Sequence, residues 1–480
     1  MASAGGAGAN GNAVGRFLFV GAGRFGDIKK LLRDDAGAMA MSTEIIGLIM
    51  IAVMLLAIFI GFPISFTLIF LGIVFGYFGF GVEKVFFLMT LKFNETMLDD
   101  QLAAVPLFVL MGIIMERAGL MERLFESVRL ILSRVRGALY LAVLFVSTIF
   151  AAATGIVGAS VTILGIMAAK TMNRAGYDVR LSAGAITAGG TLGILIPPSI
   201  MLVVMGPVLE VPVTDLFAAA IIPGMLMAFL YAAYAVGRCL INPSLGPAMP
   251  LDERAASMAE VWREFFLGLV PPAFLVFAAL GSILFGFATP TEGAGCGALG
   301  AILLALAYRR LTWENLNDSM IKTLEISVLI LLLVAASNFF GAVFAWLGTP
   351  TMLTEVLLEL ELSKTVILIM VMALIFLLGW PLEWVPIVLI IVPILLPLLD
   401  QLDVNLLWFG ILVAVNLQTA WLSPPVALSA YFLKGVVPEW DLKDIYYGMM
   451  QFMVIQLFGL ALIFIFPQIA LWLPGVIYGN

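Results

Sequence analysis

Two Pro-Pro pairs interrupt long apolar stretches of the chain, one pair in each half. They lie in residues 196–199 (Ile-Pro-Pro-Ser) and in residues 423–426 (Ser-Pro-Pro-Val). A proline inside a helix removes a backbone hydrogen bond and clashes with the preceding turn. Within a bilayer, non-helical backbone is tolerated only where it is buried in protein or lines a cavity. Two matched breaks therefore predict the binding site of a secondary transporter.

Small and hydroxyl-bearing residues surround the first break. Residues 153–160 (Ala-Thr-Gly-Ile-Val-Gly-Ala-Ser) are predicted to face residues 189–199. Freed carbonyl and hydroxyl oxygens are hard ligands that suit Na⁺, whereas the N-terminus of a half-helix carries partial positive charge and suits a carboxylate. The alternative is that these small residues only pack helices together. The matching break in the other half favours a binding role.

Glu383 is the most unusual residue near the second break, because it is a carboxylate inside the apolar block 365–399. Residues 379–384 (Gly-Trp-Pro-Leu-Glu-Trp) are predicted to face residues 416–425. Acids within the membrane are costly and mark a functional site by default. Glu383 is expected to ligate a cation, to take a proton or to cap a helix N-terminus, and these alternatives stay open.

Asn338 and Glu292 are weaker candidates. Asn338 is expected to bond neighbouring helices together within its span. Glu292 follows Ala-Thr-Pro-Thr at the start of a predicted span. A carboxylate in the first turn of a helix stabilises it, so the structural interpretation is favoured for Glu292.

Composition places the breaks in a membrane protein. The chain has 480 residues, of which 63% are hydrophobic and 11% are charged, whereas a soluble domain has about 25% charged residues. Its apolar runs do not alternate as strands of a membrane barrel would. The sequence has no histidine, two cysteines and no Walker motif, which disfavours a metalloenzyme, a histidine-based proton pump and a P-loop ATPase. We expect no enzymatic activity, no cofactor and no nucleic-acid partner.

The predicted fold is an all-α polytopic membrane protein with two inverted repeats, about eleven transmembrane helices and two re-entrant hairpins. The first repeat covers residues 41–240 with a hairpin at about 138–169, and the second covers 265–480 with a hairpin at about 365–399. Residues 241–264 are predicted to form a cytoplasmic linker. The spacing supports a duplication, because Gly155 precedes Pro197 by 42 residues and Glu383 precedes Pro424 by 41.

Apolar runs and their interruptions give the expected elements. Amphipathic arms are predicted near residues 121–135 and 350–361. The predicted spans are about 44–61, 64–80, 103–119, 179–208 and 215–239 in the first half, and 265–287, 291–308, 326–347, 404–433 and 446–474 in the second.

Residues 1–40 differ from the rest, being rich in Gly and Ala with five basic residues and lacking the apolar core of a signal peptide. They are expected to be either a disordered leader or the result of a true start at Met41. The distribution of Lys and Arg places the base of the first hairpin in the cytoplasm and that of the second outside. The same orientation puts the N-terminus outside, where a basic leader would violate the rule.

Four segments carry a resemblance to a known family. They are residues 155–160 (Gly-Ile-Val-Gly-Ala-Ser), 193–199 (Gly-Ile-Leu-Ile-Pro-Pro-Ser), 289–292 (Thr-Pro-Thr-Glu) and 423–425 (Ser-Pro-Pro). From about residue 41 to 474, the chain resembles the large membrane subunit of a TRAP (tripartite ATP-independent periplasmic) transporter. Residues 416–419 (Asn-Leu-Gln-Thr) and 431–436 (Tyr-Phe-Leu-Lys-Gly-Val) are similar to the group named for mannitol and chloroaromatic compounds.

The resemblance implies a permease of the bacterial inner membrane that imports organic acids, with Na⁺ as the coupling ion, by an elevator mechanism. The hairpins and broken spans would form a mobile transport domain, and the other helices a scaffold. The implied partners are a small four-helix membrane subunit and a periplasmic substrate-binding protein. The residues that the resemblance implies for Na⁺ are Thr154, Gly155, Ser160, Gly193 and Pro197 in the first half, and Gly379, Glu383, Ser423 and Pro424 in the second. The candidate substrate-binding residues are Thr154, Ser199, Glu383, Gln418 and Thr419.

The second site departs from the family pattern. Residues 383–385 (Glu-Trp-Val) stand where Asp-Pro-Thr is common, Ala420 and Ala427 replace frequent glycines, and Ser429 replaces a common asparagine. We therefore expect this site to bind its ion differently or to use other residues for substrate.

Other function classes remain as alternatives. One is a stand-alone Na⁺- or H⁺-coupled dicarboxylate carrier of the same fold that needs no binding protein. An intramembrane enzyme or a channel is disfavoured, because polarity concentrates at two breaks and no Ser-Lys dyad, paired acid or repeated polar lining is found in the sequence.

Overall fold

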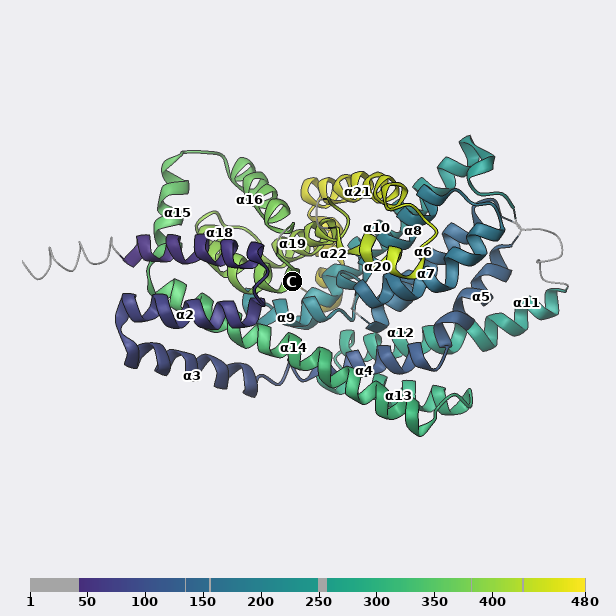
Figure 1. Cartoon of the computed structure of the whole chain (residues 1–480), viewed down its shortest axis with the longest axis horizontal. Coiled ribbons are helices and arrows are strands. Elements are labelled where there is room, and N and C mark those ends of the chain that lie inside the picture. The colour runs from purple at the N-terminus through teal and green to yellow at the C-terminus, as the bar shows by residue number, and fades with distance from the viewer. Residues whose placement is uncertain are drawn as a thin grey trace, which may run out of the picture.

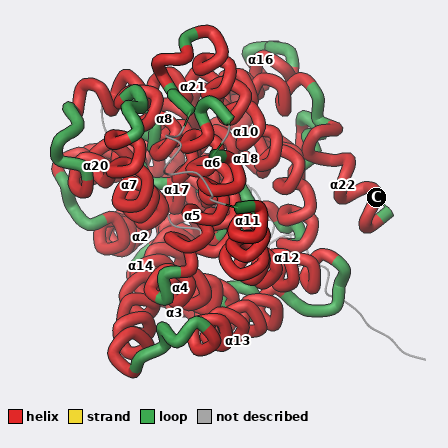
Figure 2. The backbone as a smooth tube through the Cα atoms, turned by 90° about the vertical axis from the view of Figure 1, so that its right-hand side faces the viewer, coloured by secondary structure: helices red, strands yellow, loops and turns green. Residues whose placement is uncertain are grey.

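A computed structural model describes residues 43–133, 135–154, 157–248, 257–380, 382–424 and 427–479, and it gives the backbone alone for 151–154. The regular structure in these residues is entirely helical (Figure 2). Two sequence predictions, the leader 1–40 and the ligand Gly155, lie outside the described residues. Pro381, Pro425 and Val426 lie outside them as well.

The helices follow one another in an order that is similar in the two halves (Figure 1). The first half contains the N-terminal helix (Thr43–Ile60), α2 (Ile64–Phe80), α3 (Val82–Leu98), α4 (Ala104–Arg117), α5 (Leu120–Leu132), α6 (Ala138–Thr154), α7 (Val157–Arg174), α8 (Val179–Thr191), η1 (Leu192–Ile194), α9 (Ile200–Leu209), α10 (Val213–Ile241) and η2 (Pro243–Leu245). The second half contains α11 (Met258–Glu264), η4 (Phe265–Leu269), α12 (Val270–Leu284), α13 (Pro290–Ala307), α14 (Trp313–Trp346), α15 (Thr349–Glu359), α16 (Lys364–Leu378), α17 (Trp384–Pro386), η5 (Ile387–Ile391), α18 (Val392–Gln401), α19 (Leu406–Ala420), α20 (Leu428–Val436), α21 (Leu442–Ile465) and α22 (Gln468–Tyr478).

Seven helices of the described residues are long and apolar enough to cross a membrane, or eight if α4 and α5, which meet at 64°, count as one span. This count is below the predicted eleven, because the described residues also contain shorter apolar helices of 10–17 residues, some of them ended by prolines or glycines. The chain is therefore an all-helical, polytopic membrane protein.

The two arms begin in the same way. Gly119 precedes α5 with φ 69°, and Gly348 precedes α15 with φ 80°. Both values lie in the left-handed region that glycine adopts without steric cost. Each glycine turns the chain from the preceding helix, α4 or α14, into a short arm, after which a pair of helices and a broken helix follow. The order of the helices is therefore similar in the two halves, and the predicted inverted repeats with re-entrant hairpins stay a prediction.

Helix α3 is the main element that the sequence analysis missed. It contains Glu83, Lys84, Lys92 and Glu95, so its sequence is not apolar enough to indicate a span. It packs against α2 and α14, and the three lie side by side (Figure 1). On α14, Asn338 Nδ2 donates to Thr96 Oγ1 at 3.1 Å, which confirms that this amide joins two helices.

Several boundaries differ from the predicted ones. Helix α14 begins at Trp313 rather than near residue 326, because polar residues in its first turns hide the helical pattern. Residues 258–264, predicted to belong to the linker, form α11 and continue into α12. The last predicted span ends at Ile465, and Pro467 separates it from α22.

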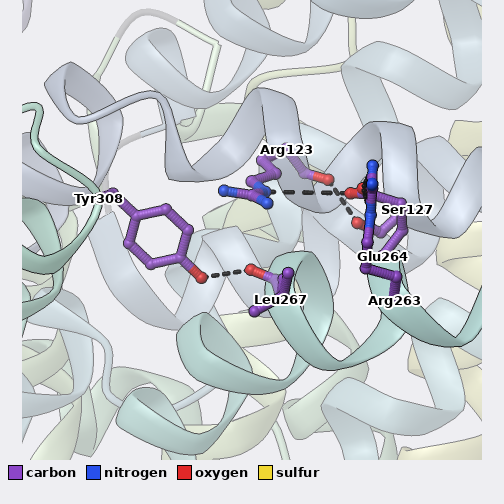
Figure 3. Close-up of polar contacts among 6 residues, drawn as sticks. All are labelled: Arg123, Ser127, Arg263, Glu264, Leu267 and Tyr308. Atoms are coloured by element: carbon purple, nitrogen blue, oxygen red, sulfur yellow. Dashed lines mark hydrogen bonds and ion pairs between the residues drawn. The ribbon is translucent and has the colours of Figure 1, made fainter. Parts of the chain in front are cut away.

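A polar cluster holds arm α5 against the junction of α11 and η4 (Figure 3). The Arg123 guanidinium lies 3.9 Å from the Glu264 carboxylate and 5.0 Å from the centre of the Tyr308 ring. The Tyr308 hydroxyl donates to the Leu267 carbonyl, which belongs to the π-helical turn η4. Such a turn displaces carbonyls from the α-helical pattern and leaves them open to other donors. The cluster joins α5 of the first half to α11 and α13 of the second.

Two groups of helices can be followed in Figure 2. Helices α4 and α13 pack together at its lower edge, whereas α21 and α8 pack together at its top. The capping box at the start of α13 confirms the structural interpretation of Glu292: its carboxylate accepts from Thr289 N at 2.8 Å, and Thr289 Oγ1 accepts from Glu292 N at 3.2 Å.

Candidate functional site

A cavity of 560 Å³ brings the two hairpins and the two breaks together. Val157 of hairpin arm α7 and Ile194 of η1 reach it from the first half. Glu383 at the tip of the second hairpin and Trp421 after α19 reach it from the second. Residues of α14, beginning with Lys322, form the facing wall. Because segments so distant in sequence converge here, this cavity is the candidate site.

The cavity contains charged side chains of both signs. Glu383 is exposed, and its carboxylate makes no capping hydrogen bond to α17, although it stands at the N-cap position. Lys322 lies 3.2 Å from Glu325 in an exposed ion pair, and Glu116 of α4 lines the cavity as well. A charged side chain at the bilayer interior is expensive, so Glu383 remains a functional candidate rather than a helix cap.

A side-chain hydrogen bond closes the loop between η1 and α9 at the first break. Ser199 is fully buried, and its hydroxyl donates to the Ile194 carbonyl at 2.7 Å across the loop. The carbonyls of Leu195, Ile196 and Pro197 have no hydrogen-bond donor assigned among the described residues. Buried carbonyls without a donor are the oxygen ligands that Na⁺ prefers in unwound transporter helices.

Two adjacent glycines let α8 approach both arms of the first hairpin. A methyl group added at Gly189 would overlap Ser147 of α6, and one at Gly190 would overlap Val161 of α7. A methyl group added at Gly190 would also lie only 3.2 Å from the Val161 backbone nitrogen, so a side chain has no room there. The glycines thus hold the hairpin directly against the helix that leads into the first break.

Hydroxyls at the second break bond within their own helix. Thr419 Oγ1 donates to the Asn416 carbonyl at 2.5 Å, and Ser423 Oγ donates to the Thr419 carbonyl at 2.8 Å. Both are fully buried or nearly so. Because each hydroxyl donates its proton to a carbonyl, its oxygen keeps lone pairs that can accept from a donor or ligate a cation.

Two alanines occupy places where the sequence departs from the family pattern. A methyl at Gly379 would stand 3.0 Å from the Ala420 side chain, so the tip of the second hairpin touches the end of α19. Ala427 has φ 38° and is fully buried. This is the left-handed region, which costs a residue with a Cβ roughly 1–2 kcal/mol. The glycine common in the family would fit here without that cost.

Unpartnered polar atoms gather at the second break. In the described part of the chain, seven buried side-chain atoms have no hydrogen-bond partner. Four of them belong to the tip of the second hairpin, to α19 and to α20. An unsatisfied buried donor or acceptor costs about 1–3 kcal/mol, so a polar ligand or an ordered water that paired with these atoms would stabilise the site. The four are Trp380 Nε1, Asn416 Oδ1, Gln418 Nε2 and Ser429 Oγ.

A second cavity of 560 Å³ lies farther along the same helices. On α14, Leu333 lines the first cavity and Val334 the second. The second hairpin passes between the cavities in the same way, from Val385 in the first to Leu389 in the second. Polar groups of α3, including Lys92, line the second cavity. Two cavities therefore follow each other along α14, with apolar side chains between them.

The predicted site residues fall into three groups. Among the described residues that line the first cavity, Glu383 is the one that the sequence predicted. Behind the cavity wall, the structure buries five predicted side chains, together with the backbone of Gly193 and Pro197; the side chains are Ser160, Ser199, Gln418, Thr419 and Ser423. Gly379 lies at the hairpin tip, Pro424 is exposed, and the Thr154 side chain is outside the described part.

Sequence reasoning missed three residues that contact the site. Lys322 lines the cavity, but it precedes the predicted start of its span. Gln456 of α21 contacts Gln418, and Tyr231 of α10 contacts Gln456. A glutamine in the middle of an apolar span is itself a signal, because polar side chains within the membrane usually serve an interaction.

Comparisons with known proteins agree on the family. Residues 49–469 match the family model described as "Tripartite ATP-independent periplasmic transporter, DctM component". The chain is 30% identical over 390 residues to the C4-dicarboxylate TRAP transporter large permease protein DctM of Pseudomonas aeruginosa, covering 81% of this chain and 89% of the relative. It is 28% identical over 434 residues to the sialic acid TRAP transporter large permease protein SiaM of Vibrio cholerae, covering 88% and 97%.

The fold is also similar to that of a solved transporter. The crystal structure of the Alcanivorax borkumensis YdaH transporter matches with a TM-score of 0.58 and 18% identity, covering 80% of this chain and 88% of the other. At that identity the likeness supports the fold alone. The family model, by contrast, spans both breaks, both hairpins and the cavity that they line. The chain therefore belongs to the DctM component family of tripartite ATP-independent periplasmic transporters, as a multi-pass permease of the bacterial inner membrane and not an enzyme.

Proposed function

We propose that this chain is the Na⁺-coupled permease of a tripartite importer of organic acids, with one Na⁺ bound at each break and the acid bound between them. The observation that carries the proposal is the convergence of both breaks and both hairpin tips at one cavity. In secondary transporters, coupling ions and substrate meet at such discontinuous helices.

The oxygens around the first break support a Na⁺ site. The carbonyls of Leu195, Ile196 and Pro197 have no donor assigned in the described residues, and Ser199 shapes the loop that presents them. Ser160 is buried at the start of α7, which packs against the same loop. These are neutral oxygen donors, which suit a monovalent cation without adding negative charge to the membrane interior.

An organic acid fits the cavity and its charges. The cavity has room for a small carboxylic acid, and Lys322, which is paired with Glu325, lines it together with the carboxylates Glu116 and Glu383. Relatives named for C4-dicarboxylates and for sialic acid transport anions of this class. Residues 416–419 and 431–436 favour the group named for mannitol and chloroaromatic compounds; this assignment to a group stays a prediction, and the name does not identify the substrate.

The arrangement of the two cavities supports an elevator mechanism. Helix α9 and the second hairpin line both cavities, α14 lines both as well, and the first hairpin lines the first cavity through α7. Movement of α9 and the hairpins along α14 would carry the site from the second cavity toward the first. The family is tripartite by description, so we expect a small four-helix membrane subunit and a periplasmic substrate-binding protein as partners.

Uptake by proteoliposomes tests this proposal. The vesicles would contain this chain and its small membrane subunit, and the binding protein would be added outside. Candidate acids, beginning with succinate and sialic acid, are first screened by thermal shift of the binding protein. Uptake is then measured with an inward Na⁺ gradient and with K⁺ in its place.

We expect uptake that requires both Na⁺ and the binding protein. Uptake without the binding protein would support the stand-alone carrier instead. Uptake driven by a proton gradient in the absence of Na⁺ would overturn Na⁺ coupling and direct attention to Glu383. Vesicles that lack the small membrane subunit are the control for that partner, and we expect them to show no uptake.

A further inference from the structure

Three buried side chains form a hydrogen-bonded relay behind the cavity. The Tyr231 hydroxyl of α10 donates to Gln456 Oε1 of α21. Gln456 Nε2 donates to the Val415 carbonyl at 2.8 Å and to Gln418 Oε1, both on α19. All three side chains are fully buried. The relay therefore links α10 and α21 to α19, the helix that ends at the second break.

The relay fixes the orientation of both amides. A backbone carbonyl can only accept, so the Gln456 group that faces Val415 must be its NH₂. Its oxygen then faces Tyr231, whose hydroxyl supplies the proton. The same NH₂ faces Gln418, which must present its oxygen in return, because two NH₂ groups would repel each other. The orientation of Gln418 follows from its partners rather than from the similar shapes of its nitrogen and oxygen.

The consequence is that Gln418 is left with a free donor. Its Nε2 is buried and has no partner among the described residues. Asn416, two residues earlier, is fixed in the opposite sense: its Nδ2 donates to the Met372 carbonyl at 2.8 Å, and its buried Oδ1 has no partner in the described part of the chain. A buried NH₂ without an acceptor costs about 1–3 kcal/mol, so the site calls for an oxygen-bearing ligand.

We propose that Gln418 donates a hydrogen bond to a carboxylate or carbonyl oxygen of the transported acid, and that Tyr231 and Gln456 are positioning residues that hold it as a donor. The inference rests on the proposed function and sharpens it. Gln418 lies one turn before Trp421, which lines the cavity, and α19 packs against η1 of the first break. The proposal therefore assigns the NH₂ group of Gln418 to the acid, while its oxygen accepts from Gln456.

The chain offers a matched control for this relay. Tyr234, one turn from Tyr231 on α10, donates to Gln451 Oε1 of α21 at 2.7 Å. This second Tyr–Gln pair joins the same two helices, but in the described residues it has no bond to α19; it bonds to Arg238 instead. Tyr231→Phe and Tyr234→Phe therefore remove equivalent hydroxyls, and only the first alters the relay.

The experiment measures KM for the acid and the half-saturating Na⁺ concentration separately, in the proteoliposomes described above. We expect Gln418→Glu, which replaces the donor by an acceptor, to raise KM about tenfold or more and to leave the half-saturating Na⁺ concentration unchanged. Tyr231→Phe should raise KM about threefold, which is less than the effect of Gln418→Glu. The reason is that the Gln456 amide loses the partner that fixes its orientation. Tyr234→Phe should change neither value.

Equal effects of Tyr231→Phe and Tyr234→Phe would overturn the relay, because both would then act through helix packing. Loss of Na⁺ dependence in Gln418→Glu would show that Gln418 is a cation ligand and would also overturn it. A second readout needs no substrate: NaCl, compared with KCl, should raise the Tm of the purified permease equally in wild type and in Gln418→Glu. If wild type transports no acid, the proposed function fails, and the Na⁺ shift still decides whether Gln418 serves the cation.

Discussion

Glycines shape the first break, whereas alanines occupy two comparable places at the second. Gly189 and Gly190 leave no room for side chains, so α8 lies directly against both arms of the first hairpin. At the second break, Ala420 touches Gly379 of the hairpin tip, and Ala427 takes a left-handed conformation. The first break brings backbone close to backbone, and the second places methyl groups between its parts.

The two breaks also differ in their polar side chains. Ser199 at the first break uses its hydroxyl to close the loop. At the second, Trp380, Asn416, Gln418 and Ser429 each leave a buried atom without a partner in the described residues. The comparison indicates that the first break presents backbone oxygens to an ion, whereas the second presents side chains, both donors and acceptors, to a ligand of mixed character.

The largest effect is expected at the close contact of the first break. Gly190→Val should overlap the Val161 side chain, crowd the Val161 backbone and force α8 away from the first hairpin. Overpacking of this kind costs about 1–3 kcal/mol, so the Tm of the purified permease should fall and uptake should be lost. Gly237→Val on α10, where nothing lies within 4 Å, is the control and should preserve both. Full uptake by Gly190→Val would show that the approach is dispensable.

The next largest effect is expected at the tip of the second hairpin. Glu383→Gln should reduce uptake about tenfold, a change of ~1.4 kcal/mol, because the carboxylate faces the cavity and caps no helix. The free energy of unfolding should stay within about 0.5 kcal/mol of wild type, because substitutions at exposed positions rarely change it by more. Normal uptake together with a lower Tm would assign Glu383 a structural role. Glu383 would then no longer count among the side chains that the second break presents to a ligand.

A serine pair compares the two loops directly. Ser199→Ala leaves the Ile194 carbonyl without a donor in the described residues and should cost about 1–3 kcal/mol. Ser423→Ala should cost less than about 1 kcal/mol, because the Thr419 carbonyl keeps its bond from Ser423 N at 2.9 Å. Chemical denaturation in detergent measures both. Equal losses would mean that the hydroxyls have equivalent structural roles.

The smallest effect has the opposite sign. Ala427→Gly should stabilise the permease by about 1 kcal/mol, because glycine accepts the left-handed conformation of this position. Ala430→Gly, three residues later inside α20, should destabilise it by about 1 kcal/mol, since glycine is a poor helix former. Thermal unfolding of the two variants side by side is the measurement. A lower Tm for Ala427→Gly would show that the alanine methyl packs favourably enough to offset its strain.

Local features of the sequence predicted much of the fold. The breaks, hairpins and arms follow from prolines and glycines, whose effects are confined to a few residues, as Gly119 and Gly348 illustrate. Helix α3 was missed because four charges hide its pattern. Orientation in the membrane and the inverted relation of the repeats stay predictions from charge and spacing.

The site itself was predictable only in part. Glu383 stood out because it is charged in an apolar block, and it does line the cavity. The relay did not stand out, because it depends on contacts between residues far apart: Tyr231 and Gln456 are separated by 225 positions, and Gln418 and Gln456 by 38. Such contacts arise from tertiary packing, and no local pattern in one sequence specifies them.

The most direct test of the account is the Na⁺ dependence of uptake by wild-type proteoliposomes at a fixed, saturating concentration of the acid. Two breaks that each bind one Na⁺ predict a sigmoidal dependence with a Hill coefficient above about 1, approaching the number of coupled sites. A hyperbolic dependence would contradict the claim that both breaks bind the coupling ion, and uptake independent of Na⁺ would contradict the account as a whole.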